Sequence, residues 1–206
     1  DETNDTDMLF ELEVEKVEAD VLYHVTDLGV RFAVEDIAED SATYTNYKTT
    51  LKTFETALQN TSSDEVFNLI DVDSFVSMYI VNELFKTVDF GYSSVKFYIQ
   101  KNADGKPIIH AGSLWDFDLS TGNSSVEECR TTTDFRGQTI NTWFGWLMRN
   151  NTFKNKVIAK FTAAQETIQN IYQANGLGDS WINKNLAYMG KSKDRNYSDT
   201  SLGGAG

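Results

Sequence analysis

Three aspartates are the residues of this chain best suited to chemistry. Asp116 and Asp118 flank a phenylalanine in the stretch GSLWDFDLSTGN (112–123), directly after a tryptophan. Asp89 ends the stretch NELFKTVD (82–89). Carboxylates beside large apolar groups need a partner, because an unpaired ion resists leaving water. The sequence leaves three partners open: a metal ion, an arginine or solvent alone.

Two predicted strands separate Asp89 from Asp116. VKFYIQ (95–100) and PIIHAGSL (107–114) are typical of strands, and ADGK (103–106) contains the Asp-Gly pair of tight hairpin turns. Because a hairpin folds back on itself, the segments before and after it become neighbours. Converging carboxylates repel one another, which raises some of their pKa values unless a cation neutralises them. Hard oxygen ligands of this kind suit Mg²⁺, Mn²⁺ or Ca²⁺.

Simpler interpretations stay open for the acidic residues. Aspartate is common in turns, and Asp118 is followed by Leu-Ser-Thr-Gly, which fits a turn. IDVDSF (70–75) resembles a calcium-binding loop only in part, since the glycine and the closing glutamate of such a loop are missing. We therefore expect Asp71 or Asp73 to cap a helix.

Histidine and cysteine usage excludes several other sites. His24 and His110 each lie in a predicted strand without a second His or Cys at ligand spacing, so both are predicted to be structural. Cys129 is the only cysteine, which excludes an intrachain disulfide and a cysteine-based zinc site. The chain has no serine elbow, no G-x-G-x-x-G and no Walker A loop.

The charge balance excludes further classes of partner. The chain has 206 residues, with 18 Lys+Arg against 31 Asp+Glu and a formal net charge of −13. Nucleic acids and anionic membrane surfaces are bound by clustered basic residues, so we expect neither as a partner. No apolar run approaches the ~20 residues of a membrane span. The acidic opening DETNDTDMLFELEVE, without a signal peptide or initiator Met, indicates a processed product or a piece of a longer protein.

The elements that must position the aspartates show two periodicities. Residues 8–36 are predicted to be rich in strands: Phe10, Leu12 and Val14 alternate with Glu11, Glu13 and Glu15, and VLYHV (21–25) and VRFAV (30–34) follow as strands. Apolar residues at three- and four-residue steps predict helices over 44–58, from about 71 to 84, over 142–150 and over 153–173. The third of these opens with Trp143, Phe144 and Trp146, which we expect in the core rather than in a sugar-binding platform.

These elements predict an α+β fold. A small N-terminal antiparallel sheet over residues 1–40 would precede a mainly helical body over 41–197, which carries the inserted hairpin and the candidate site. SDTSLGGAG (198–206) is predicted to be a disordered tail.

Several segments, in order, resemble the CotH (spore coat protein H) kinase family of atypical bacterial protein kinases. They are MLFELE (8–13), TFETAL (53–58), IDVDSFVSMYIVNELFKTVD (70–89), SSVKFYIQKNADGKPIIHAGSLWDFDLSTGN (93–123) and WFGWLMRNNTFKNKV (143–157). They lie within roughly residues 8–161, and Trp-Asp-Phe-Asp is the most specific element. The resemblance implies an atypical protein-kinase-like fold, with an incomplete small lobe and hinge-like strands over 1–40 and a large lobe over 41–197.

The resemblance also implies an activity, the transfer of the γ-phosphoryl group of ATP to Ser or Thr of a protein with Mg²⁺ or Mn²⁺. Asp89 is the implied catalytic aspartate, which orients or deprotonates the acceptor hydroxyl. Asp116 is the implied metal ligand, like the aspartate of the Asp-Phe-Gly motif in ordinary protein kinases, with Asp118 assisting. Ser94 and Glu11 are the expected cofactor-binding residues. Ser94 stands where ordinary kinases have a metal-binding asparagine.

A second function stays open, that of a catalytically inactive kinase-like module in protein binding or in surface or coat assembly. Ser94 favours it, as does the lack of a lysine in a convincing ATP-binding motif, although Lys16, Lys48 and Lys52 are available. For either function we expect an extracellular, cell-surface or spore-coat location in a bacterium.

Overall fold

The computed structural model describes residues 8–173 and 180–198. The chain divides into two compact units, Asp1–Ile158 and Ala159–Gly206. Apart from Ser198, the predicted disordered tail lies outside the described residues. The first unit contains all the residues predicted to form the candidate site.

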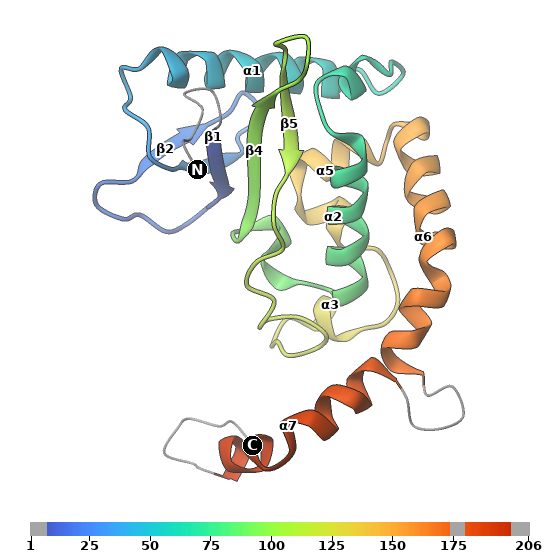
Figure 1. Cartoon of the computed structure of the whole chain (residues 1–206). Helices are drawn as coiled ribbons and strands as arrows, with labels where there is room; N and C mark the ends of the chain where they lie inside the picture. Colours follow the sequence, from blue (N-terminus) through green and yellow to red (C-terminus); the bar gives the residue numbers. More distant parts are fainter. Residues whose placement is uncertain (1–7, 174–179, 199–206) are drawn as a thin grey trace. The chain divides into compact units, whose positions relative to one another are not determined.

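One antiparallel sheet of five strands organises the first unit, in the order β2-β3-β1-β4-β5 (Figure 1). The strands are β1 (Met8–Leu12), β2 (Leu22–Val25), β3 (Arg31–Val34), β4 (Val95–Lys101) and β5 (Pro107–Ala111). β1 lies between β3 and β4, so that Phe10 is opposite Val34 on one side and Phe97 on the other. The N-terminal strands and the later hairpin therefore share a single sheet.

Helices make up most of the remaining described chain. Those up to residue 172 are α1 (Ala42–Gln59), α2 (Val72–Phe85), α3 (Glu127–Arg130), α4 (Gly137–Ile140), α5 (Thr142–Leu147) and α6 (Asn151–Tyr172), with two 3₁₀ turns, η1 (Glu65–Asn68) and η2 (Val88–Gly91). Figure 1 shows α2 running beside β5, in line with the contacts between these two elements. The predicted α+β class is confirmed.

Aromatic side chains form the core between the sheet and the helices. The ring of Phe10 lies 5.1 Å from that of Phe32 and 5.6 Å from that of Phe97. Trp143 is 1% exposed and its ring is 5.1 Å from that of Phe97, and Phe144 is fully buried. Aromatic pairs in such edge-to-face and offset arrangements add to the stability gained from burial alone. Trp143 and Phe144 are thus core residues, as predicted.

Asp71 is the N-cap of α2, which confirms the helix-cap interpretation of IDVDSF. Its side chain accepts a hydrogen bond from the backbone N–H of Asp73. The same carboxylate lies 3.1 Å from Nδ1 of His110. His24 has its own neighbour, because its Nδ1 lies 3.4 Å from the hydroxyl of Tyr44. Both histidines therefore have partners within the fold.

A buried carboxylate connects three elements of the first unit. Glu55 of α1 is 2% exposed. One of its oxygens accepts a hydrogen bond from Nε1 of Trp143 (2.7 Å) and the other from the backbone N–H of Leu28 (2.9 Å). Glu55 therefore joins α1 to α5 and to the turn between β2 and β3.

The second unit contains the end of α6 and all of α7 (Trp181–Ser198). The sequence patterns did not indicate α7. Its backbone is non-helical at Gly190, where φ is 44° and ψ is −128°. Along the predicted stripe of α6, Phe153 and Val157 are buried, whereas Phe161 is 39% exposed. No helix among the described residues is long and apolar enough to cross a membrane.

We predict that Glu55→Ala lowers the free energy of unfolding by about 3 kcal/mol, because it leaves the buried indole N–H of Trp143 and the partly buried backbone N–H of Leu28 without an acceptor. Urea unfolding monitored by tryptophan fluorescence would measure the change. Glu166→Ala, at an exposed position of α6, is the matched control and should change stability by less than about 0.5 kcal/mol. Equal unfolding midpoints for the two variants would contradict the bridging role of Glu55.

Candidate active site

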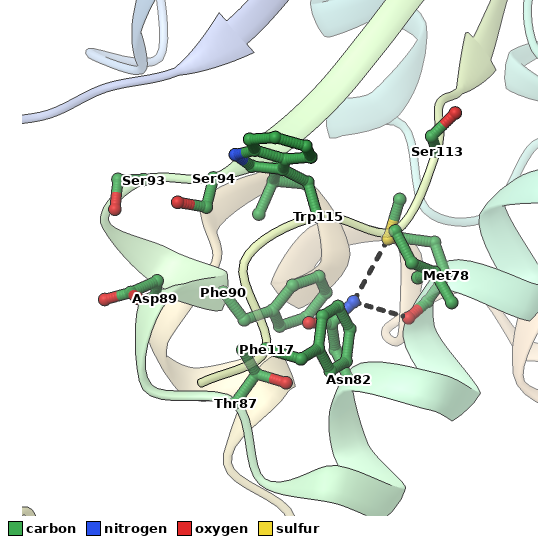
Figure 2. A pocket seen from close by; sticks show the side chains of 12 residues that line it. Met78, Asn82, Thr87, Asp89, Phe90, Ser93, Ser94, Ser113, Trp115 and Phe117 are labelled. Carbon is green, nitrogen blue, oxygen red and sulfur yellow. Dashed lines mark hydrogen bonds between the residues drawn. The ribbon is translucent and has the colours of Figure 1, made fainter. Parts of the chain in front are cut away.

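A small pocket forms where the two ends of the β4–β5 hairpin meet the C-terminal part of α2 (Figure 2). Its walls come from α2, η2, the start of β4 and the loop after β5, and they include Asn82, Asp89, Ser94, Trp115 and Phe117. Trp115 is 58% exposed, so a large aromatic face lies beside the polar groups of the pocket. The segments that flank the hairpin are therefore neighbours, as the sequence predicted.

Backbone hydrogen bonds hold the loop after β5 against the end of α2. The N–H of Val88 donates to the carbonyl oxygen of Leu119 (3.0 Å), and the N–H of Thr121 donates to that of Phe85 (2.6 Å). These bonds bring the Trp-Asp-Phe-Asp stretch close to η2, which contains Asp89. The approach of the acidic residues thus depends on backbone pairing and not on attraction between their side chains.

The three aspartates influence one another electrostatically. Asp89 is partly buried, and this burial is the main reason why its pKa is raised above the ordinary aspartate value. The charges of Asp116, Asp118 and Glu13 raise the pKa of Asp89 further, while the charge of Arg136 lowers it. The charges of Asp116 and Asp118 therefore act on Asp89, and we call these three residues the acidic cluster.

The acidic cluster is not neutralised by a salt bridge. Within the described chain, none of the three aspartates forms an ion pair with a Lys, Arg or His side chain. Among all the residues that the structure describes, no three or more His, Cys, Asp or Glu side chains are arranged to hold a metal ion. Mg²⁺, however, is commonly held by one or two carboxylates together with water and substrate phosphates. Asp116 and Asp118 fit that smaller donor set.

Two residues that face each other in the site have unusual backbone conformations. Asp116 has φ of 56° and Ser94 has φ of 59°, both in the left-handed region that non-glycine residues rarely occupy. The hydroxyl of Ser94 lies 3.5 Å from Oδ2 of Asp116, at the outer limit of a hydrogen bond. Such conformations cost about 1 kcal/mol each and gather at functional sites. Asp20, Asp36, Lys86, Thr121 and Asp134 have the same backbone conformation, so the contact between Ser94 and Asp116 beside the pocket, rather than the strain alone, makes this pair a functional candidate.

Asp118 takes part in the turn that follows it. Its Oδ1 accepts a hydrogen bond from the N–H of Leu119 (2.8 Å), and its carbonyl oxygen accepts one from Nδ2 of Asn123 (2.8 Å). The turn interpretation of Asp118 is therefore observed. Its second carboxylate oxygen, Oδ2, accepts no hydrogen bond from the described chain.

Glu11 is connected to the site by Lys96, a residue that the sequence did not indicate. Nζ of Lys96 is 2.9 Å from a carboxylate oxygen of Glu11 and 3.5 Å from one of Glu35. The same ammonium lies 5.4 Å from the ring centroid of Trp115. The hydrogen bond that Lys96 donates to Glu11 is the main reason why the pKa of Lys96 is raised. Lys96 was missed because its role depends on β1 pairing with β4, where Glu11 and Lys96 are directly opposite.

The three lysines considered as ATP-binding candidates do not line the pocket. Lys16 pairs with Glu18, and Nζ of Lys48 lies 4.5 Å from the ring centroid of Tyr44. Lys52 lies 3.6 Å from Asp27.

We predict that Asp89→Asn stabilises the fold near neutral pH. The raised pKa means that folded Asp89 binds a proton more tightly than the unfolded chain does, so stability falls as pH rises above 3.8 through the raised pKa. The variant lacks this loss and should melt roughly 1–3 °C higher at pH 7. Thermal unfolding between pH 4 and 7.5 would measure it.

Asp104→Asn, at the exposed tip of the hairpin, is the control for a lost surface charge. Its stability should follow that of the wild type at every pH. If the Asp89→Asn curve also ran parallel to the wild-type curve, the raised pKa of Asp89 would be wrong.

Comparison with known proteins gave one result that bears on this geometry. A protein-family model described as CotH kinase protein matches residues 31–198. The matched range contains Asp89, Ser94, Asp116 and Asp118, whereas Glu11 precedes it. Searches of curated proteins and of solved structures found no match.

Proposed function

The chain belongs to the CotH kinase family, and we propose that it transfers the γ-phosphoryl group of ATP to a serine or threonine of a protein in a divalent-metal-dependent reaction. The observation that carries this proposal is that the charges of Asp116 and Asp118 act on Asp89 while none of the three aspartates forms a salt bridge within the described chain. Phosphoryl transfer needs a cation on the phosphate oxygens and a carboxylate that places the nucleophile, with little further covalent help. The cluster offers both kinds of carboxylate.

Asp89 is the proposed catalytic residue. It would accept a hydrogen bond, and then the proton, from the hydroxyl of the acceptor Ser or Thr. A general base works best when its pKa lies closer to the working pH than that of an ordinary aspartate. Burial and the neighbouring carboxylates raise the pKa of Asp89 in that direction.

Asp116 is the proposed main metal ligand, with Asp118 assisting through the carboxylate oxygen that its own turn does not use. Mg²⁺ or Mn²⁺ is the expected ion, and Ca²⁺ also fits these oxygen donors. When bound, the ion would supply positive charge to the phosphate oxygens of ATP. The left-handed backbone of Asp116 supports this role, since strain of that kind gathers at ligand sites.

Ser94 and Glu11 are the proposed nucleotide contacts. Ser94 is close to Asp116 and can hydrogen-bond to a phosphate oxygen or to a water on the metal ion. Glu11 would act through Lys96, whose ammonium it holds near Trp115, the residue before Asp116. An exposed aromatic ring and a cation so close to a metal-ligand candidate are suitable for an anionic, aromatic cofactor.

The competing proposal is a catalytically inactive kinase-like module that binds a partner or organises a surface or coat assembly. Ser94 favours it, because a hydroxyl is a weaker metal ligand than the amide oxygen of asparagine. For either function we propose a bacterial cell-surface, extracellular or spore-coat location. The net charge of −13 argues against nucleic acid as a partner.

Calorimetric titration of the 206-residue chain with Mg²⁺–ATP separates the two proposals. The kinase proposal predicts saturable binding that requires the metal ion and is lost in Asp116→Ala. The control variant Asp104→Ala, at the hairpin tip, should bind like the wild type. No binding at millimolar ATP would reject the kinase proposal in favour of the inactive module.

Phosphoryl transfer from radiolabelled ATP to an acceptor protein tests the role of Asp89. We expect Asp89→Ala to keep nucleotide binding and to lower kcat at least about 100-fold, because general-base catalysis contributes about 10²–10⁴-fold. Turnover at the wild-type rate in Asp89→Ala would show that another group accepts the proton.

A further inference from the structure

Glu83, near the end of α2, binds a loop that lies far away in the sequence. Its side chain is only 9% exposed, and its two oxygens accept hydrogen bonds from the backbone N–H groups of Arg136 (2.8 Å) and Gly137 (2.7 Å). A Cβ at position 137 would come within 2.9 Å of both Glu83 Oε2 and a ring carbon of Phe90. Glycine is therefore required for this close approach of the loop to Glu83 and Phe90.

Arg136 extends from this loop to the backbone just before Asp89. It is 8% exposed, and Nη1 of its guanidinium donates to the carbonyl oxygens of Thr87 and Val88, each at 3.1 Å. Figure 2 shows Thr87 and Asp89 on the same stretch of chain at the pocket. The planar guanidinium has donors in a fixed geometry, so it restrains these two peptide groups together.

Lys86 joins the same network from the other side of Thr87. Its backbone is left-handed, with φ of 51°, at the C-terminal end of α2, a position where glycine is usually preferred. The ammonium lies 3.0 Å from Oε1 of Glu83 and donates to the carbonyl oxygens of Thr133 and Asp134. These contacts of the ammonium explain why a lysine stands at a position where the backbone conformation favours glycine.

We propose that Arg136 is a positioning residue for Asp89, held in place by Glu83 and Lys86. The inference rests on the proposed phosphoryl transfer and adds to it a loop, residues 133–137, that neither the acidic cluster nor the pocket includes. Arg136 would not touch ATP or the acceptor. It would fix the direction of the Asp89 side chain by fixing the two peptide groups before it.

The electrostatic setting agrees with this role. Arg136 is the basic group that acts on Asp89 against the combined charges of Asp116, Asp118 and Glu13. The positive charge of Arg136, bound to the carbonyl oxygens of Thr87 and Val88, also offsets part of the repulsion that acts on Asp89. Removal of Arg136 should therefore disturb both the geometry and the charge of Asp89.

The kinetic test compares Arg136→Ala and Arg136→Lys with Arg130→Ala. Arg130 is an exposed arginine six residues earlier and serves as the matched control. We expect Arg136→Ala to lower kcat about 10–100-fold with the KM for Mg²⁺–ATP within about twofold of the wild type. Arg136→Lys keeps the charge and one donor and should recover part of kcat, whereas Arg130→Ala should behave as the wild type.

A purely structural role for Arg136 predicts a different pattern. Activity would then fall only in proportion to the folded fraction, and kcat per folded molecule would equal that of the wild type in both variants. That result, or a wild-type kcat in Arg136→Ala, would overturn the proposal. Should Arg136→Ala not fold, Arg136→Lys alone decides, because the proposal requires its kcat to be reduced at unchanged KM.

Amide hydrogen exchange tests the inference without turnover, so that its failure can be told from failure of the proposed function. The N–H groups of Val88, Tyr92 and Ser93 are hydrogen-bonded in the wild type. We expect Arg136→Ala to speed the exchange of these three amides at least about 10-fold, while amides of β4 and β5 keep their rates. If Arg136→Ala does not fold, the same measurement is made on Arg136→Lys. Unchanged exchange at all three positions would overturn the inference even in an active enzyme. Fast exchange in a chain without turnover would reject only the proposed function.

Discussion

The partial burial of Asp89 beside the charges of Asp116 and Asp118 is the electrostatic constraint around which the candidate site is built. Asp89 is partly buried whereas Asp116 and Asp118 are exposed, so the cost of burying a charge falls on Asp89, and within the described chain no salt bridge to Asp89 offsets it. Hydrogen bonds between peptide groups, such as that from Val88 to Leu119, hold the carboxylates together instead. Under the proposed function, a bound cation with its phosphate groups would recover the stability that the burial of Asp89 costs.

The sheet supplies the rigidity that this arrangement needs. β1 in the centre connects the N-terminal hairpin to β4, and Phe10 packs against rings from both sides. Glu55 then joins that layer to α1 and α5 through the indole of Trp143. Asp89 lies shortly before β4 and Asp116 shortly after β5, so the packing of these strands in the aromatic core restrains the segments that contain both aspartates.

Local features of the fold were readable from the sequence, whereas pairings between distant segments were not. The Asp-Gly turn indicated the hairpin, and Asp71 indicated the start of α2, because both signals lie within a few residues of the structure they form. The hairpin in turn predicted the approach of Asp89 to Asp116. The pairing of Glu11 with Lys96 depends on which strands are adjacent, and alternation alone does not specify that. Arg136 lies in a loop without periodicity and acts through carbonyl groups, so no residue pattern indicated it.

Selective broadening of amide signals by Mn²⁺ would test the central claim most directly. Mn²⁺ added with ATP to the isotope-labelled chain should broaden the backbone signals of Ser94, Asp116 and Asp118 first, since a paramagnetic ion relaxes nearby nuclei most strongly. The signal of Asp104 at the hairpin tip should stay sharp at the same concentration. Broadening centred elsewhere, or equal broadening of Asp104 and Asp116, would contradict the claim that the acidic cluster is a site for a divalent cation and its nucleotide.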